Sequence, residues 1–138
     1  LPELIDKDME IAELRSLQLH TKTGYRAVSE DIARGIARKL NVKPHIIKGW
    51  FNETLPKYKK EIGPIALLRL DGDTYSSTKE ALDILYENVV SKGLVVIDDY
   101  YDFKGCREAL YDFYKEHKIN PALQQYPFGR VYFRKDSQ

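Results

Sequence analysis

Apolar residues recur at three- and four-residue spacing over residues 26–40, with charged residues between them. This spacing predicts an amphipathic helix. The helix should end near Asn41, because the Lys43-Pro44 pair that follows disfavours helical backbone. The stretch before it, residues 1–25, is charged and only weakly periodic, and we expect a helix or a lid-like segment there.

Two nearly continuous apolar runs lie further along the chain, at residues 65–70 and 94–97. Runs of this length predict strands that are buried on both faces, as in a parallel sheet. Between the two runs, Ser77 and Glu80 have the spacing of a capping box, and a continuous apolar helical face follows them.

Weaker patterns complete the expected order of elements. A β-branched stretch at residues 45–48 predicts a short strand, followed by an exposed connection over residues 55–60. A further helix is expected over residues 106–118. Two short strands near residues 123–126 and 130–133 should then close the chain as an antiparallel pair.

Strands that alternate with helices of this length predict an α/β fold with a mostly parallel sheet and a C-terminal antiparallel strand pair. The 138 residues suffice for one domain with its own core. We divide the chain into the N-terminal segment 1–25 and a folded part, residues 26–138.

Composition narrows the function classes. The chain has 22 Lys and Arg against 21 Asp and Glu, a net charge of +1, which gives no reason to expect nucleic acid or an anionic membrane as a partner. The apolar runs are too short to span a bilayer, and no signal peptide is visible. The single Cys106 cannot form an internal disulfide, so we expect a cytoplasmic protein.

Aspartates follow both buried strands at the point where each strand ends. Asp71 and Asp73 follow the first strand, and Asp98 and Asp99 follow the second. In open α/β sheets ligands bind beyond the carboxyl ends of the strands, so these carboxylates should converge. Like charges at short range raise each other's pKa, and a divalent cation such as Mg²⁺ would relieve the conflict. The alternative is that they serve only as turn and helix-cap residues.

Two further stretches have candidate roles at the same edge. Asp73, two residues beyond Asp71, could act as a general base beside a metal-bound hydroxyl. The Gly49-Trp50-Phe51 stretch follows a predicted strand end and could frame a planar ligand such as adenine, although both aromatic rings could equally pack the core.

Other protein classes also use a D-x-D motif after a buried strand. A Mg²⁺-dependent phosphatase of the haloacid dehalogenase type would use Asp71 and Asp73 as nucleophile and acid/base, but little chain follows for its remaining motifs. A glycosyltransferase would leave Asp98 and Asp99 unexplained. A non-catalytic, truncated domain that keeps the scaffold is the third alternative.

Four motifs in order resemble the macrocin O-methyltransferase family, over about residues 29–134. They are GWFNETLP at 49–56, LRLDGDTYSST at 68–78, VIDDY at 96–100 and GCREA at 105–109. Members of this family are S-adenosylmethionine- and Mg²⁺-dependent enzymes that methylate sugar hydroxyls of natural products. The resemblance therefore implies a Rossmann-like class I methyltransferase fold and a small, sugar-containing substrate, and it leaves a homo-oligomer open.

The resemblance also implies a role for each candidate residue. The implied metal ligands are Asp71, Asp98 and Asp99, and the implied general base is Asp73. The implied adenosine-pocket residues are Gly49, Trp50 and Phe51.

One part of the family pattern does not occur in this sequence. The family has a glycine-rich turn after its first strand and an acidic residue after its second, and both bind the cofactor. Their absence implies that the chain corresponds to roughly the last two-thirds of the domain, lacks the first two strands and holds half of a cofactor pocket.

Overall fold

A computed structural model describes residues 29–126 and 130–136 of the chain, and the expected N-terminal segment 1–25 lies outside these residues. The elements occur in the order α2 (Glu30–Lys39), α3 (Phe51–Ile62), β1 (Ile65–Leu70), α4 (Tyr75–Leu85), the short 3₁₀ helix η2 (Tyr86–Asn88), β2 (Val89–Ile97), α5 (Lys104–His117), β3 (Gln124–Tyr126) and β4 (Arg130–Arg134). No helix within the described ranges combines the length and the apolar character needed to cross a membrane.

The described strands form one mixed sheet in the order β1-β2-β4-β3. β1 pairs with β2 in parallel, whereas β2 with β4 and β3 with β4 pair antiparallel. The predicted C-terminal antiparallel pair is confirmed. The expectation of a mostly parallel sheet is wrong for this part of the chain, because β1–β2 is the one parallel pair among the described strands.

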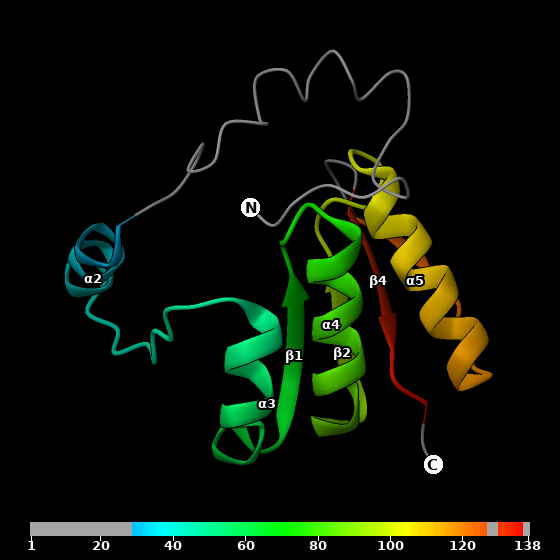
Figure 1. The fold of residues 1–138 in the computed structure, drawn as a ribbon, viewed down its shortest axis with the longest axis horizontal. Coiled ribbons are helices and arrows are strands. Elements are labelled where there is room, and N and C mark those ends of the chain that lie inside the picture. The colour runs from blue at the N-terminus through cyan, green and yellow to red at the C-terminus, as the bar shows by residue number, and fades with distance from the viewer. Residues whose placement is uncertain (1–28, 127–129, 137–138) are drawn as a thin grey trace.

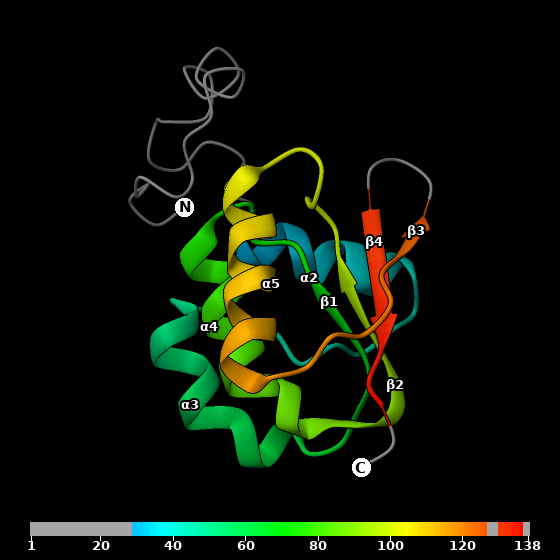
Figure 2. The same cartoon turned by 90° about the vertical axis from the view of Figure 1, so that its right-hand side faces the viewer.

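Helices α3, α4 and α5 lie on one face of the sheet (Figures 1 and 2). Apolar side chains from α4, α5 and the inner face of the strands fill the space between these two layers, and Leu82, Phe113 and Phe133 are fully buried there. The α/β class expected from the sequence is confirmed. The core therefore holds the carboxyl ends of β1 and β2 in a fixed position.

The strand predicted at residues 45–48 is absent, and residues 42–48 have no regular structure. The exposed connection expected over residues 55–60 is part of helix α3 instead. Pro56 lies inside this helix, where it removes one backbone hydrogen bond. Leu55 and Ile62 pack against the core, so tertiary contact maintains a helix that the Leu-Pro pair argued against.

The prediction that β1 is buried on both faces is also wrong. Leu68 and Leu70 are 7% exposed and pack under α4, whereas Leu67 is 56% exposed. Helices α3 to α5 cover only one face of the sheet, so the side chains that alternate along β1 have different surroundings. The apolar character of Leu67 thus has no matching burial within the described residues.

Helix α4 begins earlier than the capping box predicted. Its N-cap is Thr74, whose Oγ1 accepts a hydrogen bond from the Ser77 backbone N–H at 3.3 Å. Ser77 is therefore the third residue of the helix and not its cap. Because the N-cap Thr74 follows Asp73 directly in the sequence, the helix N-terminus adjoins the acidic motif.

Candidate active site

The acidic motifs leave the sheet side by side because β1 and β2 end in register. Leu70, the last residue of β1, pairs with Ile97, the last residue of β2. The Asp98 backbone N–H donates to the Leu70 carbonyl oxygen at 2.9 Å, which extends the ladder by one step. Asp71 and Asp99 therefore enter the two loops at the same edge, as the sequence predicted.

The loop after β1 turns sharply around Asp73. Asp73 has φ +61°, and the Thr74 N–H donates to the Gly72 carbonyl oxygen at 2.7 Å, which closes a γ-turn. A Cβ atom at Gly72 would lie 2.7 Å from the Ser77 Cβ, so only glycine fits this close approach to α4. A non-glycine residue in this conformation is uncommon, and such strained residues occur preferentially at functional sites.

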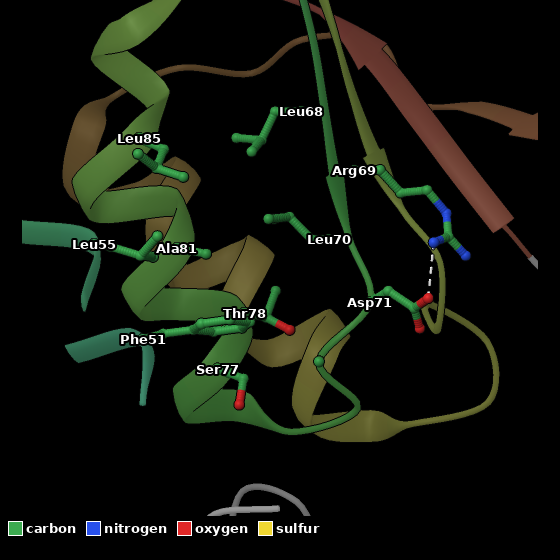
Figure 3. A pocket seen from close by; sticks show the side chains of 11 residues that line it. Phe51, Leu55, Leu68, Arg69, Leu70, Asp71, Ser77, Thr78, Ala81 and Leu85 are labelled. Carbon is green, nitrogen blue, oxygen red and sulfur yellow. Dashed lines mark ion pairs between the residues drawn. The ribbon is translucent and has the colours of Figure 1, made fainter. Parts of the chain in front are cut away.

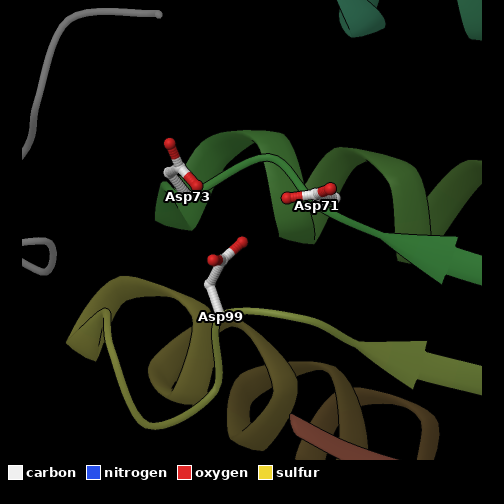
Figure 4. A group of neighbouring side chains, drawn as sticks. All are labelled: Asp71, Asp73 and Asp99. Atoms are coloured by element: carbon white, nitrogen blue, oxygen red, sulfur yellow. The ribbon is translucent and has the colours of Figure 1, made fainter. Parts of the chain in front are cut away.

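Three carboxylates meet at this edge of the sheet (Figure 4). Asp71, Asp73 and Asp99 each offer an oxygen, and these oxygens lie within 4.8 Å of one another. One oxygen of Asp99, Oδ2, is buried and has no hydrogen-bond partner among the described residues. Burial of Asp99 and the charges of Asp73 and Asp71 raise the pKa of Asp99 to about 7.

This group of oxygens fits a divalent cation better than it fits an empty surface. Hard cations such as Mg²⁺ and Ca²⁺ bind carboxylate oxygens, and a doubly positive ion would offset the repulsion that raises the pKa of Asp99. A buried oxygen without a partner is costly in a folded protein, and metal coordination would give it one. The donor set thus consists of oxygen ligands of the kind that hard divalent cations bind.

Asp98, the third ligand implied by the resemblance, has different partners. Arg69 Nη2 lies 2.8 Å from Asp98 Oδ2, and Arg130 Nε donates to Asp98 Oδ1. Burial alone would raise the pKa of Asp98, but the hydrogen bonds from Arg130 and Arg69 lower it below its usual range. The structure therefore places Asp73 beside Asp71 and Asp99, and Asp98 beside two arginines.

Sequence reasoning missed both arginines. One signal was present for Arg69, which is a charged residue inside an otherwise apolar strand. Its Nη1 lies 2.7 Å from Asp71 Oδ2, so Arg69 joins the two acidic loops. No pattern marked Arg130, since its contact with Asp98 joins residues 32 positions apart.

The predicted adenosine-pocket residues have unequal positions. Phe51, the first residue of α3, lines a cavity of about 180 Å³ together with Asp71 and Gly72 (Figure 3). Trp50 is 53% exposed, and Gly49 has φ +142° in the turn before α3. The structure thus brings Phe51, which is itself 41% exposed, to the acidic edge, whereas Trp50 lines no described cavity there.

Comparison with known proteins supports one of the protein classes that the D-x-D motif left open. Residues 4–135 match the family model described as macrocin-O-methyltransferase (TylF). This match covers nearly the whole chain and favours a methyltransferase over the phosphatase and glycosyltransferase alternatives.

Named relatives and a solved structure agree with the family match. The chain is 33% identical over 124 residues to demethyldecarbamoylnovobiocin O-methyltransferase of Streptomyces niveus, covering 88% of this chain and 47% of that protein. It is 32% identical over 123 residues to 8-demethyl-8-(2,3-dimethoxy-alpha-L-rhamnosyl)-tetracenomycin-C 4'-O-methyltransferase of Streptomyces olivaceus, covering 87% and 46%.

The structure of the O-methyltransferase NovP superposes with a TM-score of 0.79 at 30% identity, covering 99% of this chain and 56% of that one. The chain therefore spans about half the length of the relatives that it matches.

Proposed function

The chain belongs to the macrocin O-methyltransferase family, and from this premise we propose that it contributes the metal-binding half of an O-methyltransferase site. The proposed reaction transfers a methyl group from S-adenosylmethionine to a hydroxyl of a sugar or natural-product substrate, with Mg²⁺ as the cofactor. The Streptomyces olivaceus relative is named as the O-methyltransferase of a rhamnosyl-bearing tetracenomycin, which supports this substrate class. The cytoplasm remains the expected compartment.

The observation that carries the proposal is the group of three carboxylates, one of which, Asp99, has a buried oxygen without a hydrogen-bond partner among the described residues. Asp71 and Asp99 would hold the metal, and Asp98 would join them through Oδ2, the oxygen that faces Arg69, if Arg69 moved. Bound Mg²⁺ would supply a positive charge that orients a substrate hydroxyl and lowers its pKa.

Asp73 is the proposed general base. Its γ-turn directs the carboxylate toward Asp71 and Asp99, where a metal-oriented hydroxyl would lie. Asp73 would accept the hydroxyl proton on a carboxylate oxygen. S-adenosylmethionine would supply the methyl group, which would pass from sulfur to the hydroxyl oxygen and leave S-adenosylhomocysteine.

Phe51 is the best-placed candidate for contact with the adenine ring, since it lines the cavity that reaches Asp71 and Gly72. Aromatic rings stack on planar ligands in an offset or edge-to-face arrangement. Gly49 and Trp50 would form the adjoining rim of this pocket, at the start of α3.

The test compares Asp73→Asn with Asp71→Asn. We expect Asp73→Asn to retain Mg²⁺ binding and to lose about 10²- to 10⁴-fold in methyl transfer, the usual contribution of a general base. We expect Asp71→Asn to lose both. Calorimetry measures metal binding, and transfer of labelled methyl from S-adenosylmethionine to acceptors of the relatives' kinds measures turnover.

Asp31→Asn is the matched control, because Asp31 is exposed on α2 and should affect neither measurement. Equal loss of Mg²⁺ binding in both active-site variants would contradict the division of roles. Metal binding without any methyl transfer by the unsubstituted protein would show that this half of the site does not catalyse the transfer by itself.

A further inference from the structure

Arg69 occupies an unusual position in strand β1. Its neighbours Leu68 and Leu70 point under α4, whereas its side chain lies on the opposite side of the strand and reaches the acidic loops (Figure 3). The guanidinium forms two ion pairs, with Asp71 Oδ2 at 2.7 Å through Nη1 and with Asp98 Oδ2 at 2.8 Å through Nη2. One cation thus joins the acids that follow two different strands.

Arg130 completes this arrangement from strand β4. Its Nε donates to Asp98 Oδ1, the oxygen that Arg69 leaves free. Both oxygens of Asp98 therefore face an arginine, and this carboxylate is only 9% exposed. A buried carboxylate needs such partners, because an unpaired charge in the interior is strongly unfavourable.

One of the two carboxylates that Arg69 holds belongs to the candidate cation site. Asp71 belongs to the group of three carboxylates within 4.8 Å, and Asp98 is adjacent in sequence to Asp99 of the same group. A guanidinium and a metal ion cannot both take full advantage of the same carboxylate lone pairs, and the two positive charges repel each other.

We propose that Arg69 is a positioning residue that competes with the divalent cation: it holds Asp71 and Asp98 in the metal-free protein and must release Asp71 when the ion binds. Arg69 then sets the metal affinity of the site. Arg130 retains Asp98 during the exchange and keeps that buried charge paired. This inference rests on the metal site proposed above and deepens it.

The test measures binding of Mn²⁺, a paramagnetic substitute for Mg²⁺ at carboxylate sites, by electron paramagnetic resonance of the free ion. Arg69→Met keeps most of the side-chain volume and removes the competing charge. We expect its Mn²⁺ dissociation constant to fall about tenfold, as one nearby charge typically shifts an ionic equilibrium by about one unit. Arg134→Met, whose wild-type arginine donates to the Lys92 carbonyl oxygen, is the control and should bind Mn²⁺ like the wild type.

Thermal unfolding gives a second measurement of the same competition. In EDTA, Arg69→Met should unfold at a lower temperature than the wild type, because the carboxylates lose one counter-ion. Added Mg²⁺ should raise the unfolding temperature of Arg69→Met by more than that of the wild type. Where the methionine variant fails to fold, Arg69→Lys retains the charge but cannot bridge two carboxylates, and its Mn²⁺ affinity should also exceed that of the wild type.

Two results would overturn the inference, and they differ. If Arg69→Met and Arg69→Lys bind Mn²⁺ no more tightly than the wild type does, Arg69 does not compete with the ion. The proposed metal site would still stand in that case. Failure of every protein to bind Mn²⁺ would remove the proposed metal site itself, and the role of Arg69 with it.

Discussion

At Asp99, burial and the charges of Asp73 and Asp71 act in the same direction and raise its pKa to about 7. In the unfolded chain an aspartate has a pKa near 3.9. Between about pH 4 and pH 7 the folded protein therefore holds a proton that the unfolded chain has released. This difference makes the Asp99 contribution to stability fall as pH rises through that window.

We therefore predict that Asp99→Asn reduces the pH dependence of stability in EDTA. The wild type should lose free energy of unfolding between pH 5 and pH 8, because Asp99 becomes ionised next to two carboxylates. The asparagine variant cannot ionise and should lose less, so it should be the more stable protein at pH 8. Urea denaturation at the two pH values measures the difference.

Saturating Mg²⁺ provides the control for this prediction. The ion favours ionised Asp99, so it should stabilise the wild type at pH 8 and have little effect on Asp99→Asn. Parallel pH profiles of the two proteins in EDTA would contradict the elevated pKa.

Along strand β1, two adjacent leucines provide a matched pair for testing how the sheet is buried. Leu68 belongs to the core and is 7% exposed, whereas Leu67 is 56% exposed on the other face. We predict that Leu68→Ala lowers the free energy of unfolding by about 2–4 kcal/mol and that Leu67→Ala lowers it by less than about 1 kcal/mol. Urea denaturation of the two variants checks this, and equal losses would mean that the outer face of β1 is covered in solution.

Patterns of apolar residues correctly predicted the strands and the helix that pack directly against the core. The apolar runs gave β1 and β2, and the apolar helical face gave α4, because these elements face the same core. The prediction of a strand at 45–48 was wrong because a strand also needs a neighbour to pair with, and the described residues provide none there. Helix α3 was missed because Pro56 suggested a break that packing against the core overrides.

The candidate site was likewise predictable in part. The rule that parallel strands end at one edge brought Asp71 and Asp99 together from the sequence alone. The position of Asp73 depends on a γ-turn that nothing in the D-G-D spacing specifies. The partners of Asp98 could not be predicted, since Arg130 reaches it from a strand whose register only the folded sheet defines.

Across the whole molecule, several apolar surfaces remain uncovered within the described residues. Strand β1 has a partner on one edge only, the outer face of the sheet carries Leu67, and α2 stands apart from the sheet (Figure 1). The apolar face of α2, formed by Ile32, Ile36 and Leu40, is more than half exposed at each residue. The chain also spans about half the length of the relatives that it matches.

We predict that the exposed helix α2 and the packed strand β2 differ in the rate of amide hydrogen exchange. Helix α2 has ten residues and one buried side chain, Ala37, and helices of this length are marginal without tertiary contacts. Its Ser29 cap and its Glu30–Arg34 ion pair at 2.7 Å add only about 1 kcal/mol and a few tenths of a kcal/mol. Amides of α2 should therefore exchange through local opening, whereas amides at the centre of β2 should exchange only through global unfolding.

Mass spectrometry of peptides covering residues 30–40 and 93–97 measures both rates in one experiment. Ile36→Ser is the matched variant, because a residue on an uncovered helical face should change the free energy of unfolding by less than about 0.5 kcal/mol. The same variant should leave exchange in β2 unchanged. Equal protection of the two peptides, or global destabilisation by Ile36→Ser, would mean that α2 docks on the remainder of the chain in solution, and its apolar stripe would then be part of the core.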